Sequence, residues 1–133
     1  MSGKANNTAR QILIAEDDFD LRDILKIVLV EEGFEVITCM DGQVAVNHLK
    51  KAADEGTQLP AMIILDLNMP VMDGWKVAAW LDSEPKLRDI PVIVTSATEE
   101  HGEAAKALHA DAYLVKPFSS DEILGVVEMF SLL

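Results

Sequence analysis

Several short apolar runs of this sequence each end in a side chain that could take part in chemistry. Carboxylates end two of the runs, hydroxyls end a third and an amine ends a fourth. The residues are Glu16, Asp17, Asp66, Thr95, Ser96 and Lys116. Clustered carboxylates repel one another unless a cation lies between them, and Mg²⁺ prefers carboxylate and phosphate oxygens. A carboxylate beside such a metal can form an acyl phosphate, while a lysine and a hydroxyl neutralise the phosphoryl oxygens.

The apolar runs that could form strands recur five times along the sequence. They cover residues 12–15, 34–39, 62–65, 92–95 and 112–115. Four of the five are apolar at nearly every position, a pattern that is typical of strands covered on both faces. Between the runs, apolar residues recur at helical spacing within residues 21–29, 45–53, 77–81, 99–108 and 123–130.

This alternation of strands and helices predicts an α/β fold with one open, doubly wound parallel sheet. Asp18 is expected to cap the first helix and Gly33 to follow it, and Ser119 or Ser120 is expected to cap the last. Ligands bind such sheets at the carboxyl ends of the strands. The acidic, hydroxyl and amine side chains named above are therefore expected to converge at one edge.

The bulk composition predicts one globular domain that binds neither nucleic acid directly nor a membrane. Half of the 133 residues are apolar, and the formal net charge is −12, whereas nucleic acid and anionic membranes need a basic surface. The polar N-terminus has no signal-peptide core, and no apolar run could span a bilayer. With a single cysteine, Cys39, the sequence favours a cytoplasmic location. Residues 1–10 are expected to be a disordered tail, followed by the domain at 11–133.

Four motifs, in this order, resemble those of the receiver domain of two-component response regulators, and the likeness extends over residues 11–133. They are the acidic pair in ILIAEDD, the block LDLNMPVMDG, the hydroxyl in VTSA and the segment DAYLVKPF. The resemblance implies the (βα)5 flavodoxin-like fold, with strand order 2-1-3-4-5. It also implies a switch rather than an enzyme. Such a domain accepts a phosphoryl group from a histidine kinase or a histidine phosphotransfer protein, and catalyses only its own phosphorylation and dephosphorylation.

The resemblance assigns roles to particular residues. Asp66 would be the phospho-acceptor, and Lys116 would pair with the phosphoryl group. Glu16, Asp17, Asp66 and the backbone carbonyl of Asn68 would hold Mg²⁺ or Mn²⁺, with Asp17 a direct ligand and Glu16 acting directly or through water. The peptide bond after Lys116 precedes a proline and is expected to be cis.

Two adjacent hydroxyls, those of Thr95 and Ser96, compete for the role of phosphoryl-oxygen donor, and in a strand they face opposite sides. The resemblance favours Ser96, because the family's hydroxyl precedes a small residue, here Ala97. Tyr113 would then move inward with Ser96. The alternative is that Tyr113 is a half-buried aromatic residue of the strand without a switching role. The output partner would bind the face made by the fourth helix, fifth strand and fifth helix, although the segment between Ser96 and Lys116 is shorter than is usual for the family.

Other functions and arrangements stay open at this point. A small-molecule phosphatase or phosphotransferase with an aspartyl intermediate usually carries a second aspartate two residues after the first, where this chain has Asn68. A binding module that is never phosphorylated is the third hypothesis. His48, His101 and His109 are expected to be surface residues. The kinase, the output partner, the oligomeric state and whether the domain stands alone are not predicted.

Overall fold

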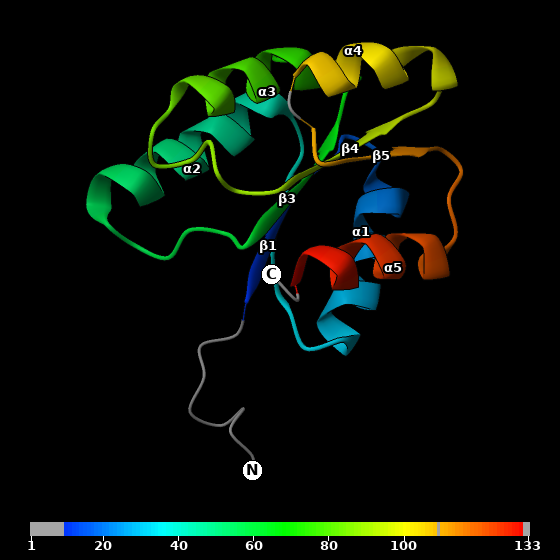
Figure 1. The fold of residues 1–133 in the computed structure, drawn as a ribbon. Coiled ribbons are helices and arrows are strands. Elements are labelled where there is room, and N and C mark those ends of the chain that lie inside the picture. Colours follow the sequence, from blue (N-terminus) through cyan, green and yellow to red (C-terminus); the bar gives the residue numbers. More distant parts are fainter. Residues whose placement is uncertain (1–9, 109, 132–133) are drawn as a thin grey trace.

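A five-stranded parallel sheet forms the centre of the computed structural model, which describes residues 10–108 and 110–131 (Figure 1). The strands are β1 (Gln11–Ala15), β2 (Glu35–Cys39), β3 (Met62–Asp66), β4 (Val92–Ser96) and β5 (Ala112–Val115). Their order is β2-β1-β3-β4-β5, and every neighbouring pair is parallel. The predicted fold class and strand order are therefore confirmed.

Helices cover both faces of this sheet. They are α1 (Phe19–Glu31), α2 (Gly42–Glu55), α3 (Gly74–Ser83), α4 (Gly102–Ala107), which follows the 3-10 turn η2 (Glu99–His101), and α5 (Ser120–Ser131). Figure 1 shows α1 and α5 together on one face, and α2, α3 and α4 on the other. No helix within the described residues is long and apolar enough to cross a membrane.

The strand pleat divides the core between these two faces. Alternate residues of β1 point in opposite directions: Ile12 and Ile14 pack with α1 and α5, whereas Leu13 and Ala15 pack with α2 and α3. Burial of both faces explains why the central strands are apolar at nearly every position. The expectation that an apolar strand is buried on both faces is wrong for β5. Its residues are all only partly buried, because β5 lies at the edge of the sheet.

Helix ends follow the capping chemistry of the sequence. The carboxylate of Asp18 accepts hydrogen bonds from the backbone amides of Asp20 and Leu21, so Asp18 caps α1 as predicted. At α5 the cap is Ser119: its hydroxyl accepts from the Glu122 amide at 3.0 Å, and the Glu122 carboxylate accepts from the Ser119 amide at 3.0 Å. This reciprocal pair fixes where α5 leaves the loop after β5.

The segment predicted as a fourth helix over 99–108 begins differently from the prediction. Its first three residues form the 3-10 turn η2, and the α-helix itself covers only six residues. Thr98 caps the turn, since its hydroxyl accepts from the Glu100 amide. The turn places His101 near the end of β4.

Candidate functional site

The register of the sheet brings four strand ends to one edge. Asp66 pairs with Thr95 at the end of β3 and β4, and Ser96 pairs with Val115, the residue before Lys116. Glu16 directly follows β1, and its amide donates to the Cys39 carbonyl at the end of β2. The four strand ends therefore lie at one edge of the sheet, as expected from parallel strands.

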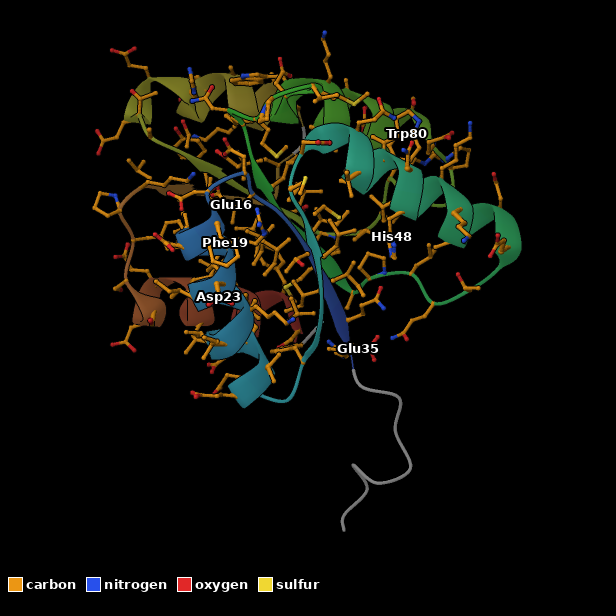
Figure 2. All side chains as sticks on the ribbon, turned by 180° about the vertical axis from the view of Figure 1, so that it is seen from behind. Glu16, Phe19, Asp23, Glu35, His48 and Trp80 are labelled. Carbon is orange, nitrogen blue, oxygen red and sulfur yellow. The ribbon has the colours of Figure 1, made fainter. Side chains whose placement is uncertain are left out.

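Three carboxylates lie close together at this edge. Glu16, Asp17 and Asp66 each offer one oxygen, and these oxygens lie within 4.8 Å of one another. Glu16 and Asp66 are each 2% exposed, whereas Asp17 is open to solvent. Figure 2 shows Glu16 beside the start of α1, the helix that carries Phe19 and Asp23. The cluster offers only oxygen ligands, and two of its three acids are buried while the third is exposed. Such a site suits a hard divalent cation that keeps some of its water.

Lys116 supplies the positive charge of the cluster. Its Nζ lies 2.7 Å from Oε1 of Glu16 and 3.3 Å from Oδ2 of Asp66. Burial alone would lower the pKa of this amine, but the hydrogen bond and charge of Glu16, together with Asp66, outweigh it and raise the pKa above its usual value. Lys116 therefore stays charged, and it reaches both carboxylates from the end of β5. Its bond to Pro117 is cis, as predicted.

Burial changes the acidity of the two inner carboxyls. It raises the pKa of Glu16 to about 7, although Lys116 and the Asp18 amide, which donates to Oε2 of Glu16, oppose the shift. Burial also raises the pKa of Asp66, again opposed by the charge of Lys116. A divalent cation bound among these acids would favour the ionised form of both carboxyls and so oppose the effect of burial.

The backbone after β3 forms one wall of the cluster. The Asn68 amide lies 3.3 Å from Oδ1 of Asp66 and donates to it. Gly74, the first residue of α3, packs so closely on β3 that a Cβ there would lie 2.2 Å from the backbone oxygen of Asp66. The carboxylate of Asp73 caps α3 by accepting from the Lys76 amide at 3.0 Å. These contacts explain the turn residues after Asp66: they press the start of α3 against the strand that carries the acid.

The loop between β3 and α3 also holds a residue in an unusual conformation. Val71 has φ of 66° and is 79% exposed. A β-branched residue in this left-handed region is a conformational outlier, because its side chain crowds the backbone. Within the loop, the amide of Met72 donates to the carbonyl of Pro70 at 2.7 Å, so a local hydrogen bond spans Val71.

The two candidate hydroxyls at the end of β4 are both buried. Thr95 is 2% exposed and Ser96 is fully buried. Oγ of Ser96 lies 3.0 Å from Nδ1 of His101 and accepts a hydrogen bond from the Thr98 amide at 3.3 Å. His101 also places its ring edge-on against Trp75, with centroids 5.3 Å apart.

This contact was not anticipated from the sequence. His101 was expected at the surface, but it is only partly exposed, and it joins the end of β4 to the start of α3. The signal that could have located it is its position five residues after Ser96, one short turn beyond the strand. His48 is partly buried on α2 (Figure 2), and His109 lies outside the described residues.

Tyr113 lies in β5 and is partly buried, and its hydroxyl donates to the backbone carbonyl of Thr98. The loop after β4 therefore contacts both Ser96 and Tyr113. The resemblance to receiver domains assigns a switching role to these two residues. The contacts make such a coupling geometrically feasible, and the switching role itself stays a prediction.

The sequence matches the response regulator receiver domain family over residues 12–128. The chain belongs to this family. Receiver domains are phospho-acceptor signalling domains of two-component systems, and the acidic cluster at the carboxyl edge of the sheet is consistent with this family.

Relatives of known name are regulators of this kind. The chain is 31% identical over 126 residues to the alkaline phosphatase synthesis transcriptional regulatory protein SphR of Synechococcus elongatus, covering 91% of this chain and 48% of that protein. It is 33% identical over 122 residues to the phosphate regulon transcriptional regulatory protein PhoB of Escherichia coli, covering 90% and 51%. The receiver domain thus spans about half the length of these relatives.

Solved structures agree with the fold. The response regulator TrrA of Thermotoga maritima, in complex with Mg²⁺ and BeF, is 29% identical with a TM-score of 0.78, covering 91% of this chain and 98% of that one. The Mn²⁺-bound form of the response regulator Rcp1 is 31% identical with a TM-score of 0.76, covering 90% and 89%. Both of those proteins hold a divalent metal, and the acidic cluster of the present receiver domain fits one.

Proposed function

We propose that this receiver domain is a cytoplasmic switch that accepts a phosphoryl group on Asp66 from a histidine kinase or a histidine phosphotransfer protein. The observation that carries the proposal is the placement of Asp66 next to two further carboxylates, those of Glu16 and Asp17, and to the partly buried ammonium of Lys116. In the transfer, a bond forms from a carboxylate oxygen of Asp66 to phosphorus. The bond from phosphorus to the donor's imidazole nitrogen breaks, and its electron pair stays on that nitrogen.

Each neighbour of Asp66 has a separate part in this step. Lys116 neutralises one phosphoryl oxygen, and Ser96 donates a hydrogen bond to another. The side chains of Glu16, Asp17 and Asp66, with the backbone carbonyl of Asn68, would hold Mg²⁺ or Mn²⁺, which supplies further positive charge to the phosphoryl oxygens when it is bound. The Asn68 amide, which donates to Oδ1 of Asp66, orients the acceptor.

The phosphorylated domain would change its affinity for an output protein. The acyl phosphate adds negative charge at the edge of the sheet. This charge would shift an equilibrium between two conformations of the domain, because it favours one of them over the other. Ser96 and Tyr113 both contact the loop after β4. Through this loop, phosphorylation of Asp66 would change the face made by α4, β5 and α5. That face is our proposed docking surface for the downstream protein.

Labelling with a small phosphoryl donor tests this proposal. Acetyl phosphate with Mg²⁺ should add one phosphoryl mass to the intact protein, and chelation of Mg²⁺ should prevent the addition. Asp66→Asn should abolish labelling, because an amide is not a nucleophile for this transfer. Asp23→Asn is the matched control, since Asp23 is an exposed acid on α1, and it should label normally. An unchanged adduct in Asp66→Asn would refute the assignment.

A further inference from the structure

The hydroxyl of Ser96 is already engaged in this structure. Its Oγ accepts the hydrogen of the Thr98 amide and lies 3.0 Å from Nδ1 of His101. A hydroxyl has one hydrogen to donate, and the Nδ1 of a neutral imidazole whose proton is on Nε2 accepts it. With the ring proton on Nε2, the Ser96 proton is directed to His101, and it is not available to a second acceptor.

His101 is fixed in place by more than this one hydrogen bond. Its ring meets the Trp75 ring edge-on, at an interplanar angle of 80°. Trp75 lies in the first turn of α3, directly after Gly74, which packs on the backbone of Asp66. The imidazole is therefore held between the end of β4 and the helix that begins beside the acidic cluster.

The segment that carries His101 is also attached to β5. The Thr98 carbonyl accepts from the Tyr113 hydroxyl. Gly102 lies against the same ring, since a Cβ on Gly102 would stand 3.8 Å from Cε2 of Tyr113. A movement of His101 away from Ser96 would therefore be transmitted to Tyr113 and to the start of α4.

We propose that His101 is a positioning residue whose ring proton is on Nε2 and whose Nδ1 accepts the hydrogen bond of the Ser96 hydroxyl until Asp66 is phosphorylated. The proposal rests on the function proposed above, in which Ser96 donates to a phosphoryl oxygen. Because the hydroxyl has one hydrogen, donation to the phosphoryl group must break its bond to Nδ1. Breaking it removes the side-chain hydrogen bond that joins His101 to β4, while the Thr98 amide can still donate to Oγ of Ser96. His101 therefore opposes the activated state, and its removal should favour binding of a phosphoryl mimic.

Two substitutions separate the hydrogen bond from the ring contact. His101→Phe keeps an aromatic ring beside Trp75 but has no acceptor, whereas His101→Asn restores a side-chain acceptor without the ring. Isothermal titration calorimetry of beryllofluoride with Mg²⁺ gives the affinity of each variant. We expect His101→Phe to bind the mimic roughly threefold to tenfold more tightly than the unmodified protein, as loss of one competing hydrogen bond implies. His101→Asn should bind nearly as the unmodified protein does.

A double-mutant cycle shows whether the effect passes through Ser96. In the Ser96→Ala background, His101→Phe should leave the affinity unchanged, because no hydroxyl remains to be released. An equal gain in both backgrounds, or no gain in His101→Phe while the unmodified protein binds beryllofluoride, would overturn the proposed role of His101. Failure of the unmodified protein to bind beryllofluoride would instead count against the function of Asp66 itself.

A measurement without any phosphoryl mimic checks the hydrogen bond separately. The ¹⁵N resonance of the His101 Nδ1 reports whether this atom accepts a hydrogen bond, and it should shift when Ser96 is replaced by alanine. A resonance that is identical in the two proteins would overturn the proposal, whatever the outcome of the binding experiments. The melting temperature of each variant, measured alongside, shows that the variants are folded.

Discussion

Glu16 links the acid-base behaviour of the site to the stability of the fold. It is 2% exposed, and burial raises its pKa to about 7. In the unfolded chain the same carboxyl has its ordinary pKa of 4.5. Between these two values the folded protein holds a proton that the unfolded chain has lost. Without a divalent cation, stability is therefore present at low pH and is lost as the pH rises through this window.

We predict that the free energy of unfolding, measured in denaturant with a chelator, falls between pH 5 and pH 7.5 by at most about 3 kcal/mol through this group. Glu16→Gln should flatten the decline, because glutamine does not titrate. Glu128→Gln, on the exposed side of α5, is the control and should keep the slope. Mg²⁺ should also reduce the slope, since it favours the ionised carboxyl. A stability that rises across this range would contradict the assigned environment of Glu16.

Elements position these residues through close backbone contacts, and one of them joins β3 to α3. A Cβ on Gly74 would lie 2.7 Å from the Cα of Leu67 and still closer to the backbone oxygen of Asp66. Backbone atoms cannot rotate aside as a flexible side chain can. Any larger residue at this position must therefore displace the start of α3 or the end of β3, and with it the acceptor carboxyl.

Gly74→Ala should accordingly destabilise the domain by about 1–3 kcal/mol and reduce labelling by acetyl phosphate. Gly125→Ala is the matched control: Gly125 lies inside α5 with no atom near its potential Cβ, so alanine there should stabilise by up to about 1 kcal/mol. Denaturant unfolding of the two variants gives the comparison. If both substitutions had the same sign, the close approach of α3 to β3 would not be what positions Asp66.

At the scale of the whole molecule, the sequence already contained the fold and the location of the site. Parallel strands place their carboxyl ends together, so Glu16, Asp66 and Lys116 could be expected to meet once the strands were recognised. The raised pKa of Glu16 could not be predicted in this way, because it depends on burial and on the exact distances to its neighbours. Capping of α1 by Asp18 could be predicted, since it is a local interaction.

Contacts that depend on one turn of irregular backbone were missed. A helical pattern over 99–108 gave no reason to place the imidazole of His101 on Ser96, because η2 replaces the first helical turn. The left-handed φ of Val71 was equally hidden, since valine rarely adopts it. Partial exposure of β5 follows from its place at the sheet edge, which an apolar run alone does not reveal.

The most direct test of the account is to locate the phosphoryl group on the labelled protein. Borohydride reduces an aspartyl phosphate to homoserine, so peptide mapping after labelling with acetyl phosphate and Mg²⁺ identifies the acceptor residue. The account predicts homoserine at position 66, in the peptide that contains the end of β3, and at no other acidic position of the cluster. Conversion of Asp17 or of another carboxyl, with Asp66 intact, would contradict it.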